Sequence, residues 1–111
     1  MDESIRVQEL NKRVSLYKPV SVPDGQGGFI DGDPLLVQTV WAKLLKPKFW
    51  TVNAQSGPAS AITQGIIIRL RKDITYGWSV KYNGMFYTIL HIDYSSAAIL
   101  TLTCQVVIHN D

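Results

Sequence analysis

Few side chains in the sequence are of types that do chemistry, and they are widely separated. Cys104 is the only cysteine, and it lies in an alternating apolar run from Leu100 to Ile108. A lone cysteine cannot form an internal disulfide, and this pattern predicts a buried thiol. His91 and His109 lie in or at the end of expected strands, without a cysteine or carboxylate at ligand spacing. The sequence therefore predicts no zinc site.

A glycine-rich segment, Pro23–Pro34, contains Asp24, Asp31 and Asp33. A calcium loop needs regularly spaced oxygens that close on a distal glutamate, and none follows here, so turn formation accounts for these aspartates. Gly25–Gly28 lacks the helix start of a phosphate-binding loop. Nucleophile-elbow, P-loop and His-Glu-x-x-His motifs do not occur. We therefore expect no enzyme activity, no cofactor and no bound metal.

The charged residues are unevenly distributed along the chain. The segment Lys43–Lys81 holds seven basic residues and one acidic residue, whereas six acidic residues precede Pro34. With this separation, the basic segment of one copy can face the acidic segment of another copy or of a stacked neighbour. The basic segment also offers a modest basic face to nucleic acid. The candidates for interface contacts are Trp41, Arg69, Arg71, Lys72, Asp24, Asp31 and Asp33.

Alternation of apolar and polar residues predicts an all-β fold of six strands, typical of a small barrel or sandwich. The strands are expected within Lys12–Lys18, Leu35–Leu45, Gly65–Lys72, two halves of a hairpin over Trp78–Asp93, and Ala98–His109. The 111 residues are 46% apolar, so residues 1–111 are expected to form a single domain. A soluble cytoplasmic product is expected, because no apolar run has the length of a transmembrane helix and the polar start is unlike a signal peptide.

The central hairpin has the clearest local signal. Asn83-Gly84 separates two alternating runs, and a type I′ turn needs positive φ at both central residues, which Asn and Gly adopt easily. Alternation before this hairpin places Ile66 and Ile68 on one face and Ile67 with Arg69 on the other.

The segment Lys46–Gln64 interrupts the alternation with 19 residues rich in Pro, Gly, Ser, Ala, Thr, Asn and Gln. Structureless segments longer than about 12 to 15 residues are uncommon in compact domains and are usually functional or disordered. We therefore predict a long mobile loop between the second and third strands. Fully stretched it spans at most about 65 Å, so an excursion and return reaches roughly 30 Å.

The order of these features resembles the phage head-tail joining proteins, also called head closure, stopper or head-tail adaptor proteins, of tailed bacteriophages and prophages. The resemblance covers nearly the whole chain. The motifs that carry it are Leu10–Val14, Asp24–Phe29, Val40–Lys43, Ile68–Thr75, Val80–Gly84 with Phe86–Ile89, and Leu100–Cys104.

The resemblance implies a β-barrel protomer that assembles into a homo-oligomeric ring of twelve or six copies beneath the portal and adaptor proteins. Such a ring closes the channel for packaged double-stranded DNA and presents a surface to tail proteins. It implies a place in the virion neck after assembly in the host bacterial cytoplasm, with no membrane involved. In relatives the long insert is associated with the central channel, and the matching candidates here are Lys46, Lys48, Phe49, Trp50, Asn53, Gln55 and Gln64.

Two alternatives remain open from the sequence. One is a tail-terminator-like ring. The other is a stand-alone nucleic-acid-binding barrel, in which aromatic residues serve as stacking platforms beside basic side chains. That barrel would use Lys43, Lys46, Lys48, Arg69, Arg71 and Lys72 with Phe49, Trp50 or Trp78.

Overall fold

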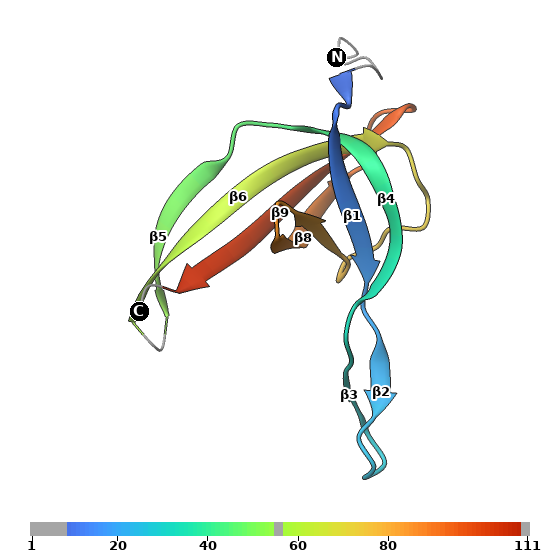
Figure 1. Ribbon diagram of the computed structural model, residues 1–111, viewed down its shortest axis with the longest axis vertical. Helices are drawn as coiled ribbons and strands as arrows, with labels where there is room; N and C mark the ends of the chain where they lie inside the picture. Colours follow the sequence, from blue (N-terminus) through green and yellow to red (C-terminus); the bar gives the residue numbers. More distant parts are fainter. Residues whose placement is uncertain (1–8, 55–56, 110–111) are drawn as a thin grey trace.

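Nine strands make up most of the computed structural model, which describes residues 9–54 and 57–109. Figure 1 shows their arrangement. The strands are β1 (Lys12–Lys18), β2 (Ser21–Pro23), β3 (Phe29–Asp31), β4 (Leu35–Leu44), β5 (Lys48–Ala54), β6 (Gly57–Arg69), β7 (Ser79–Tyr82), β8 (Met85–Asp93) and β9 (Ile99–His109).

Six of these strands close into a barrel. The sheet order is β4-β1-β7-β8-β9-β6, and pairing of β4 with β6 joins the two ends. All neighbouring pairs are antiparallel. The all-β prediction and the six-stranded barrel are therefore confirmed.

The core consists of the inward-facing residues of these six strands and of the loop between β6 and β7. Cys104 is fully buried among them, as predicted. Trp78 also lies in the core, so it cannot serve as a stacking platform for nucleic acid. The buried cluster comprises Val14, Leu16, Ala42, Ile66, Ile68, Ile74, Trp78, Val80, Tyr87, Ile89, Ile92, Leu100, Leu102 and Cys104.

Two strands depart from simple alternation. Along β8 the register shifts between Ile89 and His91, and this bulge turns Ile92 inward while His91 stays exposed. On β6 the prediction that Ile67 faces away from the interior with Arg69 was incomplete, because Ile67 is buried as deeply as Ile66. Both faces of β6 are therefore covered at this point.

The central hairpin has the predicted turn. Asn83 has φ 54° and Gly84 has φ 82°, and β7 pairs with β8 on either side. Positive φ at both central residues is the signature of type I′.

Two hairpins extend beyond the barrel. β2 and β3 form a separate two-stranded hairpin that points away from it (Figure 1). The predicted mobile loop Lys46–Gln64 was wrong: this segment is β5 and the first part of β6, paired from Lys48 opposite Thr63 to Ala54 opposite Gly57. Glycine, serine and alanine have low strand propensity, so the sequence did not indicate a strand here. Pairing with the adjacent strands stabilises the extended conformation.

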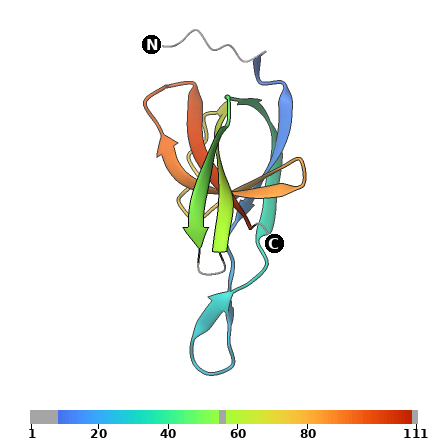
Figure 2. The ribbon, with the colours of Figure 1, turned by 90° about the vertical axis from the view of Figure 1, so that its left-hand side faces the viewer.

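We call the Lys48–Gln64 hairpin, together with Gln105–His109 of β9, the arm. β6 is its middle strand, with β5 on one side and β9 on the other. The three strands sweep outward and downward from the barrel, to the left in Figure 1, and Figure 2 shows the hairpin in front of the barrel.

Candidate interaction surfaces

The arm is anchored where β6 exchanges one partner strand for another. β4 pairs with β6 up to Leu44 opposite Ile66, and β5 begins to pair at Lys48. Between them, the Leu45 amide donates to the Gly65 carbonyl (2.9 Å), and the Gln64 side-chain amide donates to the Leu45 and Gly65 carbonyls. Gln64 is only 6% exposed. Gln64 was a candidate channel residue, but in the protomer its side chain is a buried anchor.

Each face of the arm carries a row of apolar side chains. Residues directly opposite each other in antiparallel strands share a face. Phe49 lies opposite Ile62, which lies opposite Val106, so these three form a row on one face. That face continues the barrel interior, since Ile62 and Val106 pack against the core.

The other face of the arm carries Trp50, Ala61 and Val107 in a second row. The Trp50 indole N–H donates to the Thr63 hydroxyl (3.1 Å), which fixes the ring over this face. Phe49 is nevertheless 70% exposed and Trp50 is 53% exposed. These exposed aromatic side chains make the arm a candidate interaction surface.

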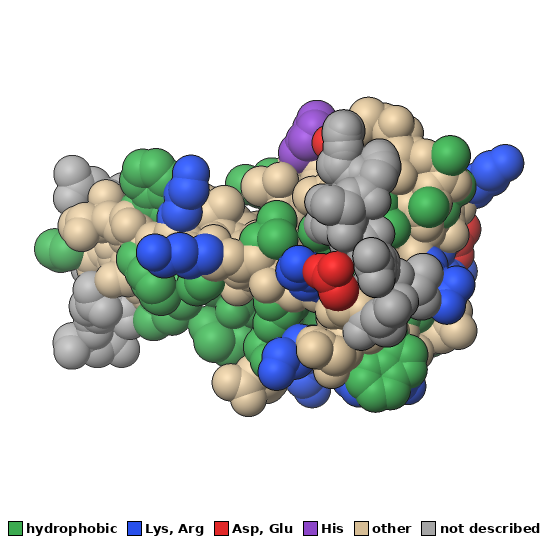
Figure 3. All heavy atoms as spheres, turned by 90° about the horizontal axis from the view of Figure 1, so that it is seen from above, with side chains coloured by type: hydrophobic (Ala, Val, Ile, Leu, Met, Phe, Trp, Pro, Cys, Tyr) green, Lys and Arg blue, Asp and Glu red, His purple; other side chains and the backbone are tan. Residues whose placement is uncertain are grey.

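The remaining predicted channel residues lie on or beside the arm. Lys46 and Lys48 are exposed at its base. Seen from above, hydrophobic and basic side chains lie near one another, among other groups, on the projecting part of the molecule at the left of Figure 3. The backbone of Asn53 is part of β5, but its side chain is not described. Gln55 lies outside the described residues.

A second surface is a groove at the seam of the barrel. β4 and β6 pair over only three positions, Ala42 to Leu44 opposite Ile68 to Ile66, so Leu35–Trp41 has a partner strand on one side only within the described residues. The groove between the separating strands has a volume of about 370 Å³. Its lining residues are Arg13, Gln38, Thr39, Val40, Trp41, Ile68, Arg69, Leu70 and Arg71. We call it the basic groove.

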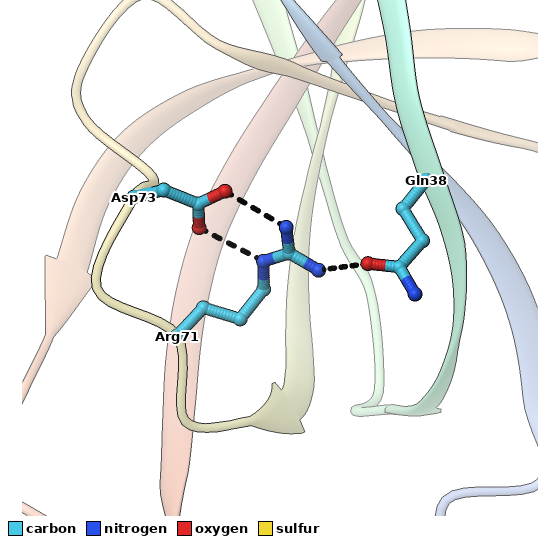
Figure 4. Close-up of polar contacts among 3 residues, drawn as sticks. All are labelled: Gln38, Arg71 and Asp73. Atoms are coloured by element: carbon cyan, nitrogen blue, oxygen red, sulfur yellow. Dashed lines mark hydrogen bonds and ion pairs between the residues drawn. The ribbon is translucent and has the colours of Figure 1, made fainter.

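The charges of the three groove arginines are not equally available. Arg71 forms a two-point contact with Asp73 (Nε to Oδ1 2.9 Å, Nη2 to Oδ2 2.8 Å), and its Nη1 donates to Gln38 Oε1 at 2.6 Å (Figure 4). The hydrogen bonds from Arg71 hold the pKa of Asp73 below its usual value. Arg71 is therefore a local tie between β4 and the chain after β6, with its charge balanced within the protomer.

The charges of Arg13 and Arg69 are not balanced by a described carboxylate. The Arg13 guanidinium lies over the Trp41 ring, 4.6 Å from its centre, and Arg13 pairs directly with Trp41 across β1 and β4. Within the described residues neither Arg13 nor Arg69 forms an ion pair. Trp41, an interface candidate from the sequence, is 51% exposed and is not a core residue.

The acidic candidates all lie on the β2–β3 hairpin or at its base. Asp24 Oδ1 accepts from the backbone amides of Gln26 (2.7 Å) and Gly28 (3.0 Å), and these bonds lower its pKa. Asp24 therefore has a turn-forming role, as the sequence predicted. Asp31 and Asp33 are exposed and form no ion pair among the described residues.

Neither a metal centre nor a reactive thiol is found among residues 9–54 and 57–109. No cluster of three or more His, Cys, Asp or Glu side chains occurs there. Burial raises the pKa of Cys104 to about 12, so its thiol stays protonated near neutral pH. Among the described residues, no helix is long and apolar enough to cross a membrane.

Two residues that matter for these surfaces were missed from the sequence. Arg13 reads as an ordinary exposed strand residue, and only the strand register places it over Trp41. Phe29 had a usable signal, because an aromatic residue in a glycine- and aspartate-rich turn segment has no apolar neighbours to bury it locally. It is 72% exposed.

Comparison with known proteins gives an independent result. The fold is similar to a chain of the solved structure described as "Virion of native gene transfer agent (GTA) particle", with a TM-score of 0.77 and 17% identity, covering 91% of this chain and 97% of that one. At this identity the likeness supports the fold alone. The comparison with curated proteins found no significant match. Residues 5–107 match the family model described as "Phage head completion protein". Because this match spans most of the sequence, the chain belongs to the phage head completion protein family.

Proposed function

We propose that this structural protein of the phage particle forms a homo-oligomeric ring in the neck, beneath the portal and adaptor proteins. In this role the ring closes the DNA channel after packaging and offers a surface to the tail. The arm is the closing element: each copy contributes one, and together the arms obstruct the central hole.

The observation that supports this proposal is the exposed apolar arm. β5 has seven residues, and at roughly 3.3 Å per residue the hairpin reaches about 23 Å beyond its root. A three-stranded arm suits an obstruction better than a loose loop, because its middle strand, β6, is paired with a strand on each side. Phe49 and Trp50 gain cover only when another surface meets them.

The charge of the arm suits temporary contact with DNA. Lys46 and Lys48 are the charged side chains of the segment Lys46–Gln64. Phosphate binding strengthens with each neutralised phosphate, so two lysines per copy hold a duplex end weakly enough for later release.

The test is a shortened arm with an intact root. Thr51 lies opposite Ser60, so replacing Val52–Ala59 by Asn-Gly joins two paired residues through a two-residue hairpin turn and keeps the register. The control is the full-length arm with Thr51→Ser, a mild change at the same site.

In particles lacking the protein and complemented with each variant, we expect both variants to dock on the neck. Heads carrying the shortened arm should leak DNA, whereas the control should retain it. Docked rings that retain all DNA despite the shortened arm would exclude closure by the part of the arm beyond Thr51 and Ser60 and leave the structural role in the neck intact.

A further inference from the structure

The β2–β3 hairpin presents an acidic and an aromatic side chain side by side. β2 and β3 pair as Pro23 opposite Phe29 and Ser21 opposite Asp31, so Phe29 and Asp31 lie on one face, two residues apart. Both are exposed, and Phe29 is 72% exposed. Within the described part of the chain, nothing balances the charge of Asp31.

The basic groove offers the complementary pair of groups. Trp41 and Leu70 give it an exposed apolar wall, and Arg13 and Arg69 supply cations that no described carboxylate balances. The free edge of β4 along Leu35–Trp41 lies beside it. A carboxylate and an aromatic ring on one face of a hairpin match a groove with this composition.

These two surfaces cannot meet within one copy. The hairpin precedes the start of β4, whereas Trp41 is the seventh residue of that strand, which puts roughly 20 Å of extended chain between them. The hairpin also points away from the barrel (Figure 1). Two different complementary surfaces on one chain produce head-to-tail contacts between copies, and such contacts form closed rings when the rotation closes.

We infer that the hairpin face bearing Phe29 and Asp31 docks in the basic groove of a second copy. Asp31 pairs with Arg69, and Phe29 packs against the wall formed by Trp41 and Leu70. This inference rests on the proposed ring and names the contact between its neighbouring subunits. It also accounts for the apolar exposure of a hairpin that has no core of its own.

Nucleic acid fits this groove less well. A strand of phosphates is recognised by a stripe of cations that follows its backbone. Of the three groove arginines, Arg71 is already paired with Asp73, and Arg13 lies over Trp41. The groove therefore has two arginines beside an apolar wall, which is a better complement to one carboxylate and one aromatic ring than to a row of phosphates.

Charge reversal tests the contact in the full chain. Asp31→Arg and Arg69→Asp each place like charges in contact, so each should weaken self-association about tenfold or more at low salt. The mixture of the two single variants, and the double variant, should recover association to within about threefold of wild type, because each restores opposite charges. Sedimentation velocity across a concentration series measures the effect.

Matched controls carry the same charge changes outside the docking pair. Asp33→Arg and Lys72→Asp lie within two or three residues of the tested positions, and both native side chains are exposed. They should change association by less than about threefold, since rim charges act mainly through screened long-range attraction. All variants alter exposed residues, and thermal melts confirm that each one is folded.

The outcomes separate the docking contact from the ring itself. Single variants that associate as wild type, a mixture that recovers nothing, or a wild-type protein that stays monomeric at millimolar concentration would overturn the inference. If electron microscopy of complemented particles shows normal rings with either single variant, the docking contact is wrong and the ring stands. If charge exchange restores association but only open chains form, the contact stands and the ring is wrong.

Discussion

At the scale of single residues, the backbone at Gly84 has the most direct energetic consequence. Gly84 has φ 82°, and apart from Gly84 itself and its two chain neighbours no residue has an atom within 4 Å of the position a Cβ would take. A substitution there therefore meets no clash, and its cost comes from the backbone alone. Positive φ is unfavourable for any L-residue and most so for a β-branched one.

We predict that Gly84→Val lowers the free energy of unfolding by more than about 1 kcal/mol. The control is Thr88→Val, which places the same β-branched residue at an exposed position of β8 and should change stability by less than about 0.5 kcal/mol. Urea denaturation of both variants gives the comparison. Equal stability of Gly84→Val and wild type would mean that this turn does not hold its conformation in solution.

At the scale of elements, the root of the arm decides whether the arm is rigid. Gln64 and Leu45 tie the end of β4 to β6 at the point where β5 takes over as partner. Close packing reinforces the tie, because a Cβ at Gly65 would come within 2.7 Å of Leu45 Cδ1. The arm therefore continues the barrel as a single sheet, not as a flexible attachment.

We predict that Gln64→Leu destabilises the protein by about 1–2 kcal/mol, because the Leu45 carbonyl loses its side-chain donor in a partly buried position. Amides of Lys48–Ala54 should exchange with solvent faster than in wild type. Gln105→Leu is the matched control, since Gln105 lies on the neighbouring strand and its side chain has no hydrogen bond among the described residues. Unchanged exchange in β5 would show that strand pairing alone holds the arm.

The barrel strands were predictable from the sequence and the arm was not, for a physical reason. β1 and β9 alternate large apolar and polar residues, and that pattern directly reflects one buried and one exposed face. The segment Gly57–Gln64 contains small and polar residues, so its extended form depends on pairing with β5 and β9. Long-range pairing of this kind leaves little trace in local composition.

The interaction surfaces were predictable only in part. Phe49, Trp50 and the basic and acidic stretches were identified as candidates from their types. Their relation in space was not, because it depends on strand register: register puts Arg13 over Trp41 and leaves Arg69 free while Arg71 is paired. Register also determines that Gln64 is buried although its sequence neighbours suggest a loop.

At the scale of the whole molecule, three projecting or open surfaces point in different directions from one barrel. The arm and the β2–β3 hairpin leave the barrel at different places (Figure 1). The basic groove lies at the seam of the barrel. A protein that has its own core and also exposes several apolar or charged surfaces is suited to contact several neighbours at once. In the proposed ring, the hairpin and the groove would contact adjacent copies, and the arm would face the channel.

Substitutions in the arm can distinguish two mechanisms by which the arms of the proposed ring would obstruct its channel. If the arms close by packing on one another, Phe49 and Trp50 are essential; if they close by holding DNA, Lys46 and Lys48 are. The exposure of the aromatic pair favours packing, since burying each ring contributes about 1.5–3 kcal/mol.

We therefore predict that Phe49→Ser combined with Trp50→Ser leaves the isolated protomer folded, with a melting temperature within a few degrees of wild type, but yields particles that leak DNA. Lys46→Gln combined with Lys48→Gln should retain DNA and show only a weaker dependence of retention on salt. Leu90→Ser, at an exposed position of β8, controls for the loss of apolar surface as such. Retention of DNA by the aromatic variant together with leakage from the lysine variant would reverse the assignment, because closure would then depend on attraction between the arms and DNA.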